Sequence, residues 1–132
     1  MLRSTLAVIA GFVLWTVLWL AANAVMTAAM PDSFNEDGIS DDNAIMIVSI
    51  LLSVVFSVLG GYTTAMVAKV NEMKPVVILA VLELVVGIIV EISYWDVIPV
   101  WYHVTFLVLL VPSIVFGGRM ALKRKQGAVT AP

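Results

Sequence analysis

The sequence contains no cysteine and a single histidine. Without cysteine there are no disulfides, no thiolate nucleophile, and no cysteine-ligated zinc or iron–sulfur site. The short motifs of serine hydrolases, zinc proteases, P-loop and dinucleotide-binding proteins and c-type haem attachment are absent as well. One histidine and no cysteine leave little for nucleophilic chemistry. The sequence therefore argues against an enzyme, and we expect no cofactor.

Charge is also scarce: 12% of the 132 residues are charged, whereas 62% are hydrophobic. A soluble globular domain averages about 45–50% apolar and about 25% charged residues. A chain this short cannot bury so much apolar surface, because small proteins leave a large fraction of their surface exposed. Disordered chains have the opposite bias. The composition therefore predicts an integral membrane protein.

Long apolar segments without lysine or arginine follow one another along the chain. Each has about 20 residues or more, enough for an α-helix to cross about 30 Å of hydrocarbon. Short connections between such helices favour antiparallel neighbours. We therefore predict an all-α integral membrane protein, an up-down-up-down bundle of four transmembrane helices. It forms a single domain over 1–132, with helices at 6–30, 44–68, 75–94 and 100–120 and a polar tail at 121–132.

The basic residues all fall on one side of this predicted bundle. Neither of the connections 31–43 and 95–99 contains any. The seven are Arg3, Lys69, Lys74, Arg119, Lys123, Arg124 and Lys125. Because positively charged loops stay in the cytoplasm, we expect both termini there and the acidic loop 31–43 outside. The predicted location is the plasma membrane, in a bacterium the inner membrane, with bilayer lipid as a partner.

The first apolar segment has an alternative interpretation as a secretory signal peptide. Arg3, the apolar run 6–20 and the small residues at 21–24 fit that pattern. The uncharged run continues to Met30, however, which makes it long enough to span a membrane. We therefore expect this segment to be retained as a helix.

Small and hydroxyl residues form a stripe along the second segment. They recur every three or four residues and so share one helix face. This small-residue stripe consists of Ser49, Ser53, Ser57, Gly60, Gly61, Thr64 and Ala68. Small residues let helices approach closely in membranes, and hydroxyls bond across helices. We expect the stripe to be the central seam of the bundle, with Gly87 and Gly117 as further packing residues; a polar permeation path is the alternative.

Glu83 lies in the middle of the third segment. It stands eight residues beyond Pro75, a rise of about 12 Å that places it near the bilayer midplane. A carboxylate at that depth costs at least ~2.5 kcal/mol on insertion scales. No basic residue lies at a similar depth, so the carboxyl must be protonated, hydrogen-bonded or paired with another subunit. One hypothesis is a proton or ligand site formed by Glu83 with Asn23, Ser53 and Ser57; a neutral structural hydrogen bond is the other.

A second polar group falls at the loop end of the third and fourth segments. Glu91, Asp96 and His103 are of residue types that bind metals. Their spacing of five and seven residues matches no specific ligand signature. A solvated or hydrogen-bonded histidine is therefore favoured over a metal site.

The two charged clusters of the chain need no specific ligand. In the acidic loop 31–43, we expect Ser40, Asp41 or Asp42 to cap the second helix. Docking of a basic partner is the alternative. The basic run 119–125 suits orientation and attraction to anionic headgroups. It is too short and too close to the membrane for nucleic acid, which we exclude as a partner.

The stretches 60–65 and 95–103, with the closing Gly-Gly-Arg of 117–119, resemble small four-helix bacterial inner-membrane proteins of unassigned function. That resemblance implies a fold and no activity. The small multidrug resistance transporters share the size and layout but place their essential glutamate in the first helix, whereas Glu83 lies in the third. Their dual topology also needs a weak charge bias, and here the bias is complete.

Two hypotheses for function follow. In the first, the protein acts through helix–helix association, as a homo-oligomer or as an accessory subunit of a membrane complex. The small-residue stripe and loops too short for a soluble site motivate it. In the second, the protein is a proton-coupled small-molecule or ion transporter or channel that uses Glu83.

Overall fold

Helices make up nearly all of the chain in a computed structural model, which describes residues 2–36, 39–40, 42–69 and 73–130. The elements are α1 (Leu2–Ala29), a 3-10 turn η1 (Pro31–Ser33), α2 (Asn43–Ala68), α3 (Lys74–Ser93) and α4 (Val100–Thr130). The four α-helices of this described part are each long and apolar enough to cross a membrane. The all-α, four-helix prediction is confirmed at that level.

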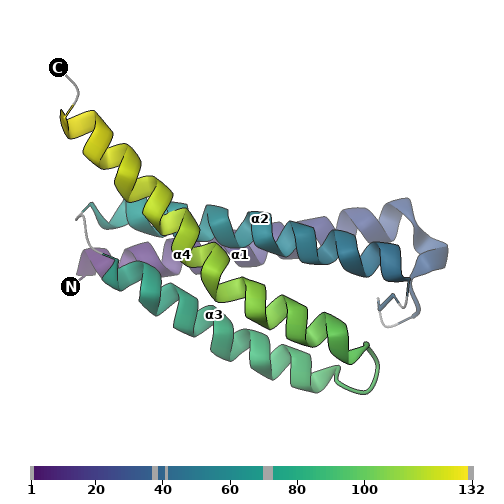
Figure 1. Cartoon of the computed structure of the whole chain (residues 1–132). Coiled ribbons are helices and arrows are strands. Elements are labelled where there is room, and N and C mark those ends of the chain that lie inside the picture. Colours follow the sequence, from purple (N-terminus) through teal and green to yellow (C-terminus); the bar gives the residue numbers. More distant parts are fainter. Residues whose placement is uncertain (1, 37–38, 41, 70–72, 131–132) are drawn as a thin grey trace.

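Successive helices run in opposite directions (Figure 1). The α1–α2 and α3–α4 connections therefore lie together at one end of the molecule, which we call the loop end. The start of α1 and the end of α4 lie at the other, the terminal end. α4 crosses α2 over the middle of the bundle (Figure 1).

α4 extends to Thr130, well beyond the start of the predicted polar tail at 121. The run 121–126 contains strong helix formers and neither glycine nor proline, so nothing in it stops the helix. Ala121 is fully buried, and Arg124 donates a 2.7 Å hydrogen bond to the hydroxyl of Tyr62. Charge ends the apolar span here but does not end the helix.

Basic side chains from two other helices cover the C-terminal end of α2. Arg3 Nε donates to the carbonyl of Val67 at 2.7 Å, and Lys125 Nζ donates to the carbonyl of Ala65 at 2.5 Å. The last carbonyls of a helix have no intrahelical partner and carry the negative end of its dipole. α2 then ends at Lys69, whose φ of 64° is left-handed. Arg3 and Lys125 therefore close the C-terminal end of α2.

The starts of α2 and α3 follow the sequence signals. Asp42 is the N-cap of α2, and its carboxylate accepts a 2.9 Å hydrogen bond from the amide of Ala44. The hydroxyl of Ser40 in turn accepts from the amide of Asp42 at 3.1 Å. Pro75 lies in the first turn of α3. The alternative cap, Asp41, lies outside the described residues.

The small-residue stripe is buried along its whole length between α1 and α4. On the α1 side, Gly60 faces Gly11, and a Cβ added to Gly60 would lie 3.5 Å from the Gly11 carbonyl oxygen. Thr64 Oγ1 donates to the carbonyl of Ala7 at 3.1 Å. Gly11 was not singled out from the sequence, although Ala7 and Gly11 lie four residues apart, the small-xxx-small spacing of close helix packing.

On the α4 side, the stripe makes a reciprocal contact. A Cβ on Gly61 would overlap the carbonyl oxygen of Ile114, and a Cβ on Gly117 would overlap the carbonyl oxygen of Val58. The two glycines are 56 residues apart (117 − 61), and so are Val58 and Ile114 (114 − 58). α2 and α4 run in the same direction (Figure 1), and each helix makes the same glycine-to-carbonyl contact with the other, so the arrangement is quasi-twofold. This is the close backbone approach that small residues permit in membranes.

Candidate functional site

Two glutamates of α3 lie in the interior of the bundle. Glu83 is 3% exposed and Glu91 is 6% exposed. They are eight residues apart, about 12 Å along the helix axis, and they share one helix face. Buried carboxyls are rare unless paired. Their surroundings therefore decide what each of them does.

Glu83 lines a cavity of about 220 Å³, which we call the central cavity. Its walls are side chains of α1, α3 and α4, and nearly all of them are aromatic or aliphatic. Glu83 and Glu91 are the ionisable members of this lining, and no basic side chain belongs to it. Glu83 Oε1 is buried and has no hydrogen-bond partner in the part of the chain that the structure describes. Glu83 thus presents an unsatisfied carboxyl oxygen in a largely apolar cavity.

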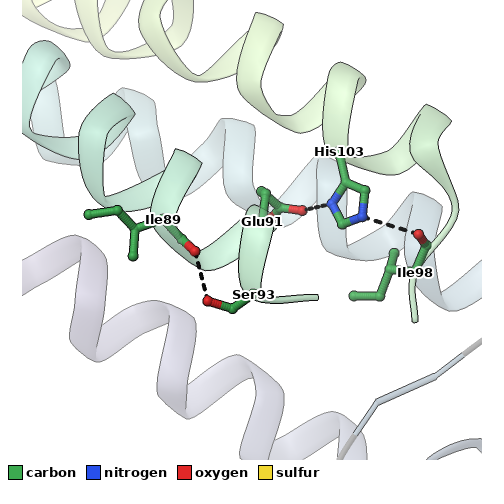
Figure 2. Close-up of polar contacts among 5 residues, drawn as sticks. All are labelled: Ile89, Glu91, Ser93, Ile98 and His103. Carbon is green, nitrogen blue, oxygen red and sulfur yellow. Dashed lines mark hydrogen bonds and ion pairs between the residues drawn. The ribbon is translucent and has the colours of Figure 1, made fainter. Parts of the chain in front are cut away.

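Glu91, in contrast, is paired with His103 of α4 (Figure 2). Glu91 Oε2 contacts His103 Nδ1, and Nε2 on the far side of the ring lies 3.1 Å from the carbonyl oxygen of Ile98. Because a carbonyl oxygen only accepts, Nε2 carries a hydrogen. The Nδ1–Oε2 contact then shares one proton, and the pair has zero net charge whichever atom holds it. A buried pair of zero net charge avoids the cost of an isolated buried charge.

A second cavity, of about 200 Å³, lies at the loop end and is lined by more polar groups, among them Asn23 and Ser49. We call it the loop-end cavity. It shares Trp19, Val90 and Glu91 with the central cavity. The two cavities are therefore neighbours, and Glu91 with its histidine partner stands at their junction.

The three residues expected to form a site with Glu83 lie elsewhere in the bundle. Asn23 lines the loop-end cavity, and Asn23 Nδ2 and Ser53 Oγ donate to backbone carbonyls of their own helices at 2.8 and 2.7 Å. Ser57 accepts a 3.0 Å hydrogen bond from Trp15 Nε1. None of the three is hydrogen-bonded to Glu83 or lines the central cavity. Their hydrogen bonds go to backbone carbonyls or to Trp15, and none of them is a partner of Glu83.

Of the three metal candidates, the structure brings two together. Glu91 and His103 form the pair, while Asp96 lies exposed in the α3–α4 connection. Both ring nitrogens of the histidine already have protein partners. Within the described ranges, no three histidine or carboxylate side chains gather as a metal site would require. The geometry fits the hydrogen-bonded histidine.

An aromatic cluster forms one side of the central cavity, and it was not assigned from the sequence. We call Trp15, Trp19 and Phe106 the aromatic wall. Trp15 and Trp19 are stacked with centroids 5.4 Å apart, and the ring of Phe106 lies 6.4 and 5.9 Å from them. The four-residue spacing of the tryptophans was the available signal, since it places both on one helix face. That Phe106 of α4 joins the two tryptophans depends on how α4 packs against α1, which the sequence does not show.

The remaining packing glycine, Gly87, also lines the central cavity. A Cβ added there would lie 3.3 Å from the side chain of Leu107 of α4. Together with the internal contacts of the small-residue stripe, this leaves the predicted packing residues engaged within the chain. Association with a second chain stays a prediction, and it would need a different surface.

Comparisons with protein families, with curated proteins and with solved structures each found no match to this chain. Function is therefore argued from the side chains of the bundle, because a helical architecture by itself implies no activity.

Proposed function

We propose that the protein is a proton-coupled transporter of a small solute and that Glu83 is the residue that binds both proton and solute. The observation that supports this proposal is the unsatisfied Glu83 carboxyl oxygen beside the central cavity. A structural glutamate in the membrane would have its oxygens satisfied by neighbouring helices, because unpaired buried polar atoms are destabilising. An intramembrane carboxyl left open to a cavity is instead available to a proton or ligand.

The neighbouring loop-end cavity supports a route to this site. It is lined by polar groups, and it shares part of its lining with the central cavity. Towards the terminal end the interior is closed by packed side chains, since Val76, Leu79 and Ile114 are at most 1% exposed. A bundle with access from one end favours alternating access over an open channel.

The proposal includes an orientation. We place the protein in the plasma membrane, in a bacterium the inner membrane, with the terminal end in the cytoplasm and the loop end outside. The distribution of basic residues supports it, because cytoplasmic segments carry the excess of lysine and arginine. Solute and proton would then reach Glu83 from the outer side.

Reconstitution of the full chain into liposomes with an internal pH-sensitive dye tests the proposal. A pH gradient should drive proton uptake in the presence of a transported solute, and Glu83→Gln should reduce the rate by at least about tenfold, since the amide cannot release a proton. Glu36→Gln, the same change at an exposed loop residue, should leave the rate unaltered. Equal proton flux in Glu83→Gln and the unmodified protein, at equal incorporation, would contradict the proposal.

A further inference from the structure

We infer that the solute bound at Glu83 is an organic ammonium ion with small apolar substituents. The inference rests on the proposed function, because it names the class of solute that the central cavity recognises. It combines the unsatisfied carboxyl with the aromatic wall beside it.

The charge of the lining selects the sign of the ligand. The central cavity contains two carboxyls and no basic side chain. Glu91 already has His103 as its partner, so Glu83 is the group with free capacity. An anion would meet carboxyls with no compensating charge, whereas a cation would find the one partner that Glu83 lacks.

The aromatic wall selects the kind of cation. The indole N–H of Trp15 is occupied by Ser57, so this residue offers the cavity its ring rather than a hydrogen-bond donor. Phe106 adds a ring with no polar atom. Ring faces attract organic cations, with tryptophan the strongest, and aromatic groups are the usual partners of quaternary ammonium ions.

A metal cation fits the same lining poorly. Calcium takes about six to eight oxygen ligands, and magnesium needs a near-octahedral oxygen shell. Beyond the two carboxyls, the central cavity offers the hydroxyl of Thr16 among aromatic and aliphatic groups. The volume of about 220 Å³ limits the ligand to a small one. An ammonium ion with methyl or benzyl substituents would pair with the Glu83 carboxyl, contact the aromatic wall and fit the volume of the cavity.

Binding exchanges the cation for a proton. Without a cationic partner, a carboxyl buried among apolar side chains is most stable when it is uncharged. Cation binding then converts the carboxylic acid into a carboxylate with the ammonium beside it, and one proton leaves to solvent. No bond of the cation is made or broken. The one other titratable group in the lining is Glu91 on α3, in its zero-charge pair with His103; the α1 and α4 walls contribute none.

The test is calorimetric titration of the full chain in lipid nanodiscs with benzyltrimethylammonium chloride, with empty nanodiscs subtracted. We expect saturable binding to one site and the release of about one proton per cation, measured in two buffers of different ionisation enthalpy. Glu83→Gln should weaken binding by at least about tenfold, and Trp19→Leu by about threefold or more. Glu36→Gln should bind as the unmodified protein does. Neopentylbenzene, in which carbon replaces the ammonium nitrogen, should show no saturable binding.

Saturable binding of neopentylbenzene equal to that of the ammonium would overturn the inference, and so would unchanged ammonium affinity in Glu83→Gln. Trp19→Phe, which keeps a ring in the wall, provides a milder variant if Trp19→Leu does not fold. Glu83-dependent proton flux without ammonium binding would refute the ligand class and leave the proposed function intact. If the unmodified protein showed neither proton flux nor ammonium binding, the ligand class and the proposed function would both be refuted.

Discussion

Glu83 and Glu91 belong to one helix, share one face and are almost equally buried, yet their surroundings differ. The difference lies in what α4 places opposite each of them. His103 meets Glu91, whereas the α4 side chains that line the cavity with Glu83 include Phe106 and Leu110. A single polar residue on a neighbouring helix therefore divides two similar carboxyls into a satisfied pair and an open site.

The comparison teaches that burial alone does not identify a functional carboxyl in a membrane. The two side chains are of the same residue type and are buried to a similar degree. Only Glu83 keeps an unsatisfied oxygen, and it does so beside a cavity. The Glu91 pair is expected to contribute to stability, and Glu83 to binding. Substitutions at the Glu91–His103 pair should therefore change the free energy of unfolding, and substitutions at Glu83 should change ligand binding.

The largest expected effect follows from removing the partner of Glu91. His103→Leu leaves a buried carboxyl without its histidine, which should destabilise the bundle by about 3–5 kcal/mol. The apolar double variant with Glu91→Leu should recover most of that loss, because a buried pair can be replaced by packed apolar side chains. Unfolding in mixed micelles, followed by circular dichroism, gives these free energies.

The second prediction concerns the stability of the bundle when Glu83 is replaced by an apolar residue. Glu83→Leu removes an oxygen that has no hydrogen-bond partner. The free energy of unfolding of this variant should therefore stay within about 1 kcal/mol of that of the unmodified protein, or be higher. A loss of stability from Glu83→Leu as large as that from His103→Leu would show that Glu83 is structural. That result would remove the distinction on which the proposed site depends.

The sequence predicted the helices well because long apolar runs without charge are a strong signal. It also singled out Glu83 from depth alone. It grouped Glu91 with His103 and favoured a solvated or hydrogen-bonded histidine, but it did not identify Glu91 as the partner, which depends on the register between α3 and α4 and hence on the path of residues 94–99. Helical periodicity fixes which residues share a face, but not which residue of a neighbouring helix lies opposite. The aromatic wall, assembled from α1 and α4, escaped for the same reason.

The next prediction transfers the histidine partner from one carboxyl to the other. In the antiparallel α3–α4 pair, Leu110 lies two turns beyond His103 and lines the central cavity with Glu83. Leu110→His should therefore give Glu83 a partner like that of Glu91. We expect benzyltrimethylammonium to bind at least about tenfold more weakly while Glu83 itself is unchanged. Leu110→Met, which stays apolar and similar in volume, controls for the change in packing.

Binding of the ammonium by Leu110→His with undiminished affinity would break the comparison. It would mean that the absence of a partner is not what makes Glu83 available. The calorimetric titration in nanodiscs applies without change, and the helical signal in circular dichroism checks that the variant is folded.

A smaller loss of stability than that of His103→Leu is expected from the ring that covers the histidine at the loop end. Trp95 stacks on the ring of His103 with centroids 4.7 Å apart and an interplanar angle of 11°, and it is 43% exposed. Trp95→Leu keeps an apolar cover but loses the stacked ring, so it should lower the free energy of unfolding by about 0.5–1.5 kcal/mol. Ammonium binding at Glu83 should stay the same, because Trp95 does not line the central cavity. If Trp95→Leu instead changed the binding free energy by more than the free energy of unfolding, the two carboxyls would be coupled. A shift of the His103 ring would then reach the central cavity through Glu91, which lies at the junction of the two cavities.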